Sequence, residues 1–216
     1  MAWEWQRSLI YSPSRPSIAW PGRPASEPAS PATIAGDRGA QVDLYLKLME
    51  EVKGRIKAVE AMHIAFDKRQ LPIADNYALE FCWLQLRMIC ETVALACVVA
   101  HADSVGDGLR QLAEKWRPTE LMRRMDSLVP SFFPQPVAWQ VDGSTLTLDA
   151  PDGVHMDRKT LVEMHGRVSE ALHRGRLGNV IEGRPSTLGS FSDVHAQARR
   201  IIDLLSNHTI QVGPRR

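Results

Sequence analysis

The chain has 216 residues, of which 44% are hydrophobic, and its formal net charge is +1. This length allows one domain whose core needs neither disulfides nor metals for stability. The near-neutral charge excludes a strongly basic surface of the kind that nonspecific nucleic-acid binders carry, although local basic patches remain compatible with it. Cys82, Cys90 and Cys97 lie seven or eight residues apart, too far along one helix to bridge. They indicate small buried side chains in a reducing compartment.

Residues 1–40 differ in composition from the rest of the chain. Prolines recur there among serine, alanine and arginine, at positions 13, 16, 21, 24, 28 and 31. This pattern predicts a disordered, extended N-terminal arm. The arm is either a leader without a function of its own or a docking segment anchored by Trp3, Trp5 and Trp20. It lacks the continuous apolar run of a secretory signal, so we expect a cytoplasmic protein.

A first long helix is predicted from about Gln41 to Arg69. Apolar residues recur at intervals of three or four, with lysine and glutamate between them, at Leu44, Leu48, Val52, Ile56, Val59 and Met62. Leu71-Pro72 ends this helix, and Asp75 or Asn76 can cap the next one. The pattern predicts an amphipathic helix with one face in the core.

The segment from Glu80 to His101 is apolar on almost every helical face, which is typical of the central helix of a domain. Glu80, Arg87 and Glu91 share one stripe of it. Because an unpaired buried charge costs several kcal/mol, we expect these three residues to form a structural ion-pair cluster. Two charges, a glutamine and a threonine within residues 81–100 argue against a membrane span.

The next part of the chain contains short helices and a hairpin. Helices are predicted near residues 109–116 and 118–128, the second with Pro118 at its first position. Alternating residues at 137–141 and 145–148 predict a β-hairpin, with Asp142-Gly143 as its turn.

The last part of the chain returns to helical patterns. An amphipathic helix is predicted from about Asp157 to 175–178, and Ser190-Phe-Ser-Asp193 resembles a capping box before a final helix. Residues 209–212 are expected to add a short strand to the hairpin. The fold class is therefore mainly α, a helical bundle with a small β-hairpin insertion, in a domain at residues 41–212.

Most motifs that carry chemistry are absent from the sequence. It has no phosphate-binding glycine loop, no nucleophile elbow, no zinc-binding His-Glu-x-x-His and no Cys-x-x-Cys. His165 and His173 lie eight residues apart, roughly 12 Å along a helix, and cannot share one metal unaided. We predict neither a metal nor a cofactor.

The helix near residue 160 carries an arginine followed by a histidine in two registers. Arg167 and His173 have five residues between them, and Arg158 and His165 have six. With the long first helix and the apolar second helix holding Arg87 and Glu91, this arrangement resembles the HEPN family of small helical-bundle proteins. Many members of that family are metal-independent ribonucleases of toxin and defence systems. Val168 departs from the family pattern, which usually has a polar residue after the arginine.

The resemblance implies a catalytic pair, Arg167 and His173, with Arg158 and His165 as the alternative pair. The histidine would act as general acid or base on a ribose 2′-hydroxyl, and the arginine would stabilise charge on the phosphate. The partners implied are a second copy of the chain, RNA and a neutralising protein, without a membrane. His165 falls near the apolar stripe of its helix and is expected in the core. The competing hypothesis is a non-catalytic HEPN-like interaction or adaptor module.

Overall fold

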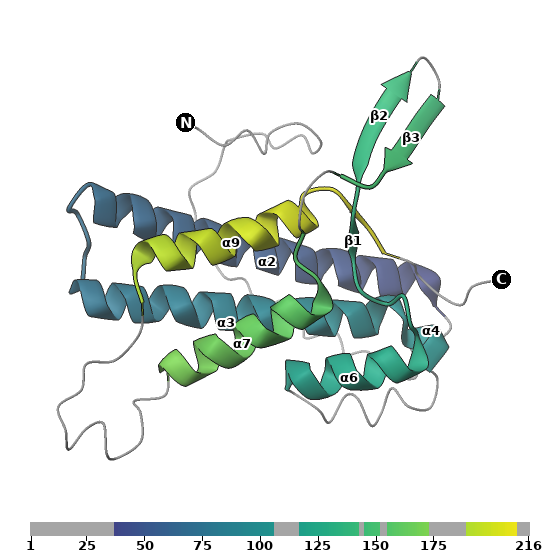
Figure 1. Ribbon diagram of the computed structural model, residues 1–216, viewed down its shortest axis with the longest axis horizontal. Helices are drawn as coiled ribbons and strands as arrows, with labels where there is room; N and C mark the ends of the chain where they lie inside the picture. Colours follow the sequence, from purple (N-terminus) through teal and green to yellow (C-terminus); the bar gives the residue numbers. More distant parts are fainter. Residues whose placement is uncertain (1–36, 106–116, 143–144, 152–154, 173–188, 211–216) are drawn as a thin grey trace, which may run out of the picture.

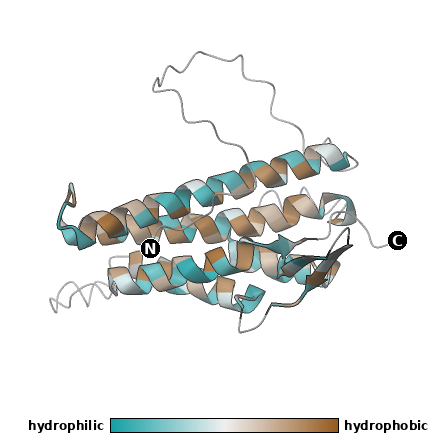
Figure 2. Ribbon diagram, turned by 90° about the horizontal axis from the view of Figure 1, so that it is seen from above, coloured by the Kyte–Doolittle hydropathy of each residue, from teal (hydrophilic) through white to brown (hydrophobic). Residues whose placement is uncertain are grey.

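The computed structural model describes residues 37–105, 117–142, 145–151, 155–172 and 189–210. The described chain is a helical bundle with a small two-stranded antiparallel insertion, which confirms the predicted fold class. Helices α2 (Arg38–Asp67) and α3 (Asp75–Ala100) run antiparallel along the length of the bundle, and α7 (Arg158–Leu172), α9 (Phe191–Leu205) and α6 (Pro118–Leu128) pack on them (Figure 1). Hydrophobic and hydrophilic residues alternate along these helices (Figure 2).

Helix α2 begins three residues before the predicted start. The side chain of Asp37 accepts a hydrogen bond from the backbone N–H of Ala40 at 3.0 Å, which satisfies a donor of the first turn. The helix ends at Asp67, and Arg69 has a left-handed backbone with φ of 55° ahead of Leu71-Pro72. Residues 1–36 of the predicted N-terminal arm lie outside the described residues, and residues 38–40 belong to α2.

Helix α3 is the central helix that its composition predicted. It contacts α2, α6, α7 and α9, and its side chains at Ala78, Cys82, Leu86 and Ile89 are fully buried. All three cysteines are free and buried, as expected, and burial raises the pKa of Cys82 to about 11. Among the described helices, α3 alone is long and apolar enough to cross a membrane by length and composition. However, 61% of its apolar window is buried inside the bundle.

Two short helices follow α3 in the described chain. The single turn α4 (Ala102–Val105) comes directly after α3, and α6 begins with Pro118 in its first turn, as predicted. Leu121, Met122 and Met125 of α6 are buried against the core. The helix predicted at 109–116 lies outside the described residues.

The β structure differs from the prediction in two places. Strands β2 (Ala138–Asp142) and β3 (Thr145–Asp149) form the hairpin, but Asp142 pairs with Thr145 and therefore belongs to the strand. Asp142-Gly143 is therefore not the turn that the sequence predicted, and positions 143 and 144 lie outside the described residues. Strand β4 (His208–Thr209) pairs with β1 (Gln135–Pro136), not with the hairpin. The predicted strand at 209–212 was thus assigned to the wrong partner, and residues 211 and 212 lie outside the described chain.

The last two helices begin at the predicted caps. Asp157 accepts a hydrogen bond from the backbone N–H of Thr160 at 2.8 Å before α7. Ser190 and Asp193 form a reciprocal capping box before α9, which confirms that prediction. The expected end of α7 at 175–178 lies outside the described residues.

Two histidines lie close to the core, His101 fully buried and His208 partly buried. His208 lies under α2, where its Nε2 accepts a hydrogen bond from the Tyr45 hydroxyl at 2.6 Å and its Nδ1 donates to the Leu205 carbonyl at 2.9 Å. His101 is fully buried, and its Nδ1 donates to the Cys97 carbonyl at 2.9 Å. Burial lowers the pKa of both imidazoles, because the charged form loses hydration.

These two histidines predict how stability changes with pH. The unfolded chain takes up protons at the ordinary histidine pKa near 6.5, before the folded chain does, so the free energy of unfolding falls as pH drops below about 6.5. We expect this decline to be shallower in the His101→Gln/His208→Gln double variant. Urea unfolding at a series of pH values between about 5 and 8 measures it. Equal slopes for both proteins would contradict the assignment.

Candidate functional site

A cluster of polar side chains lies where α3 meets α7. Arg87 Nε donates a hydrogen bond to Glu91 Oε1 at 3.0 Å, and His165 Nε2 contacts the same carboxylate oxygen at 3.2 Å. The side chains are 22%, 19% and 10% exposed for Arg87, Glu91 and His165, respectively. We call these three residues the α3–α7 cluster. It is mostly enclosed by the bundle but still reaches solvent.

Helical spacing explains how the sequence builds this cluster. Arg87 and Glu91 lie one turn apart on α3, at the border between its buried side and its solvent side. His165 shares the core-facing side of α7 with Leu161 and Val168, which are fully or almost fully buried. A histidine in that position needs a polar partner, because burying an unpaired imidazole is costly. Glu91 is that partner.

The hydrogen bonds leave specific atoms available for chemistry. Since a carboxylate only accepts, Nε2 of His165 carries the proton in this contact, and the neutral imidazole keeps its lone pair on Nδ1. Glu91 thereby fixes the tautomer of His165. Arg87 uses Nε toward Glu91, and within the described residues no hydrogen bond involves its two terminal amino groups. The arrangement combines an imidazole that a carboxylate orients with a guanidinium whose terminal N–H groups make no hydrogen bond to other described residues.

The other predicted residues are placed separately from this cluster. Glu80 is half-buried on α3, and no ion pair between described residues includes it. Arg158 forms an ion pair with Asp126 of α6, which lowers the pKa of the Asp126 carboxyl. Both residues line a cavity of about 550 Å³ at the start of α7. Arg158 and His165 are seven residues apart, about 10 Å along the helix, and belong to different surroundings.

The leading predicted pair is described only in part. Arg167 is exposed, and it lies two residues after His165, so it projects from nearly the opposite side of α7. His173 lies outside the described residues. In the part of the chain that the structure describes, no group of three histidine, cysteine or acidic side chains could hold a metal ion.

Sequence reasoning named every member of the α3–α7 cluster but did not join them. Arg87 and Glu91 were assigned to one set and His165 to another, because 74 positions separate Glu91 from His165. One signal pointed to the contact: a histidine on an apolar stripe and a pair of charges on an apolar helix each require a polar neighbour. They satisfy each other.

Comparison of the chain with protein-family models, with curated proteins and with solved structures finds no match.

Substitution of Glu91 tests whether the α3–α7 cluster stabilises the fold. We expect Glu91→Gln to lower the free energy of unfolding by about 1–2 kcal/mol, since it removes the negative charge that pairs with Arg87 and His165. Glu80→Gln is the matched control on the same helix, and we expect a change within about 0.5 kcal/mol. Chemical denaturation measures both. Equal effects of the two substitutions would show that the cluster is not a stabilising contact.

Proposed function

We propose that the chain is a metal-independent endoribonuclease of a toxin or defence system, active as a cytoplasmic homodimer. The observation that carries the proposal is the α3–α7 cluster, which holds an imidazole by a carboxylate and places a guanidinium beside it. The resemblance to the HEPN family supplies the reaction class. Arg167 and His173 remain the proposed catalytic pair.

The chemistry of RNA cleavage suits these side chains. A neutral imidazole takes the proton of a ribose 2′-hydroxyl, whose oxygen attacks the adjacent phosphorus. The bond to the 5′-oxygen breaks, and that oxygen takes a proton from an acid, leaving a 2′,3′-cyclic phosphate and a 5′-hydroxyl. Guanidinium groups stabilise the negative charge that builds on the phosphate oxygens. None of these steps requires a metal.

The helix α7 links the cluster to the proposed catalytic pair. It carries His165 in contact with α3 and Arg167 on its exposed side, and His173 lies outside the described residues. We assign Arg87 the role of binding phosphate through its terminal amino groups, and we assign Glu91 the role of positioning His165. Arg158 is engaged by Asp126 and is not assigned a role in cleavage.

Cleavage of RNA by purified protein tests the proposal. We expect cleavage in the presence of EDTA, with 2′,3′-cyclic phosphate ends, and a loss of about 100-fold or more in rate for His173→Ala. Arg167→Gln should also lose activity. His155→Ala is the control, because His155 lies at the base of the hairpin and contacts the Pro151 carbonyl. Circular dichroism and thermal unfolding establish that each variant folds.

Two results would end the enzyme proposal. One is the absence of cleavage by the wild-type chain on varied RNAs, and the other is equal cleavage by wild type and His173→Ala. Retained activity in Arg158→Gln would indicate that Arg167 and His173 catalyse the cleavage and that the alternative pair, Arg158 and His165, does not.

A second function, a non-catalytic interaction module, is favoured by the hairpin. Strands β2 and β3 extend away from the helices (Figure 1), and the paired residues Trp139 and Leu148 are 56% and 51% exposed. Large apolar side chains side by side on a protruding hairpin are suited to binding another protein. A protein with an apolar surface patch of its own is the class of partner that this surface would bind.

Growth inhibition in cells that produce the chain separates the two functions. The enzyme predicts that His173→Ala removes the inhibition and that Trp139→Ser/Leu148→Ser leaves it in place. The module predicts the reverse pattern. Colony counts after induction, with equal protein levels shown by immunoblot, measure the difference.

A further inference from the structure

One side of α3 is apolar and open to solvent. Tyr77, Leu84 and Leu95 are 54%, 43% and 43% exposed, although α3 is the central helix of the bundle. Phe81, Met88 and Val99 are partly exposed on the same side. Their spacing keeps all six within roughly 60° of the helix circumference. We call this stripe the free face of α3.

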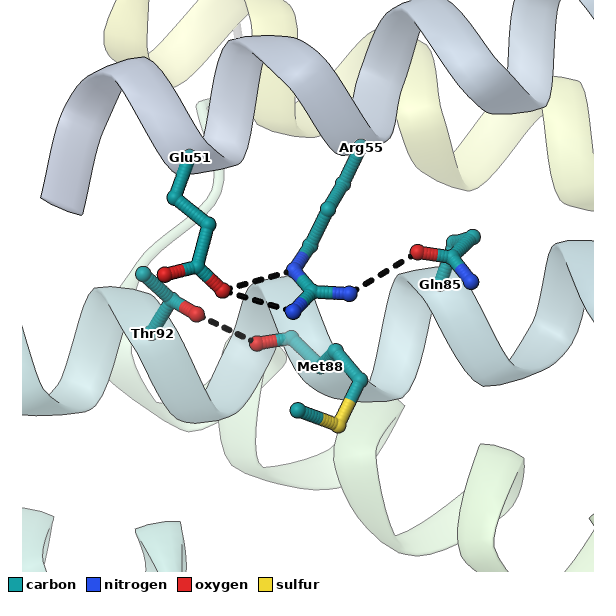
Figure 3. Close-up of polar contacts among 5 residues, drawn as sticks. All are labelled: Glu51, Arg55, Gln85, Met88 and Thr92. Carbon is teal, nitrogen blue, oxygen red and sulfur yellow. Dashed lines mark hydrogen bonds and ion pairs between the residues drawn. The ribbon is translucent and has the colours of Figure 1, made fainter. Parts of the chain in front are cut away.

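Helix α2 extends this surface beside α3. Arg55 of α2 donates hydrogen bonds to Glu51 and, at 2.9 Å, to Gln85 of α3, next to Met88 and Thr92 (Figure 3). The partly buried Leu48 and Met62 flank these contacts on α2. The free face is about 33 Å long, and the two helices together are about 20 Å wide. This area, roughly 600 Å² per copy, approaches the 800 Å² or so that each partner buries in a standard interface.

We infer that the free face of α3 is the surface through which two copies of the chain associate, with their α3 helices antiparallel. The stripe is symmetric about its middle. When it is reversed about Met88, Tyr77 falls on Val99 and Phe81 falls on Leu95. A two-fold axis at this point therefore sets apolar side chains against apolar side chains at these positions, while Leu84 falls opposite Thr92.

The charges at the border of the free face favour the same arrangement. In an antiparallel pair the same edges of the two helices meet, so Arg87 and Glu91 of one copy lie beside those of the other. The four charges then lie in the order Glu91, Arg87, Arg87 and Glu91, and each Arg87 is about 3 Å along the axis from both the Glu91 and the Arg87 of the second copy. Each copy contributes one cation, Arg87, and one anion, Glu91, so the shared edge carries no net charge from these residues.

A membrane surface fits this face less well. The charged residues that border it on α2 and α3 are three acids and two arginines, at Glu51, Arg55, Glu80, Arg87 and Glu91. A surface helix that binds anionic lipid carries lysine and arginine on its flanks instead. Self-association is the interaction that both the apolar pattern and the charge pattern support.

The association would also bring the two α3–α7 clusters together. Because Arg87 and Glu91 lie near the two-fold axis, both α3–α7 clusters border one shared groove, and each copy contributes an imidazole and a guanidinium to it. This consequence rests on the proposed function, whereas the interface itself rests on the free face of α3 alone.

Sedimentation equilibrium of the full chain tests the interface. We expect a dimer for wild type and at least about a 100-fold weaker dimer for Leu84→Glu, since each interface would bury two new carboxylates. Ile64→Glu is the matched control, because Ile64 is an exposed apolar residue on α2, 50% exposed, that lies outside the free face. A monomeric wild type would overturn the proposal, as would equal weakening by both substitutions. Binding of monomeric wild type to vesicles of phosphatidylglycerol and phosphatidylcholine, lost in Leu84→Glu, would overturn it in favour of a membrane.

Single cysteines test the orientation without disturbing the fold. The native cysteines are buried, so wild type should not cross-link under mild oxidation. In the antiparallel dimer the two cysteines of Met88→Cys lie close to each other at the two-fold axis and should form a disulfide. The two cysteines of Leu84→Cys lie about 12 Å or more apart along the axis and should not. Cross-linking of both variants would indicate parallel helices and overturn the proposed geometry. Cross-linking of neither would overturn the interface. Absence of RNA cleavage by a wild-type chain that does form the dimer would count against the proposed function but not against the interface.

Discussion

The structure depends on one constraint: α3 is apolar around almost its entire circumference, and the rest of the described chain covers only part of it. Helices α2, α6, α7 and α9 all contact α3, which explains why they surround it. Burial of its side chains supplies much of the hydrophobic stabilisation, at about 25 cal/mol for each Å² removed from water. The uncovered remainder is the free face of α3.

The same constraint governs the polar residues on α3. Arg87 and Glu91 lie at the border between the covered and uncovered sides, where each needs a partner but still reaches solvent. His165 enters from α7 and shares the Glu91 carboxylate. A cluster in this position is both a brace between helices and a group of side chains that a ligand could contact. It connects the stability of the bundle to the proposed chemistry.

Much of the fold could be predicted from the sequence because its signals are local. The period of the apolar residues, Pro118 at a helix start and the capping box at Ser190 each act within a few positions. Strand β4 was assigned to the wrong neighbour because its pairing with β1 joins segments more than 70 positions apart, and no local pattern encodes that choice. The contact between Glu91 and His165 escaped prediction for the same reason. The composition of α3 predicted a buried helix, but it could not specify which of its sides the chain would leave open.

Oxidative footprinting of the full chain at increasing protein concentration tests most directly whether a second copy covers the free face of α3. Met88 and Tyr77 of the free face should be oxidised in dilute solution and become protected as the concentration rises. Trp139 on the hairpin, exposed and outside the free face, should react equally throughout. Equal oxidation of Met88 and Tyr77 at all concentrations would contradict the proposed interface, because it would show that no second copy covers the free face of α3.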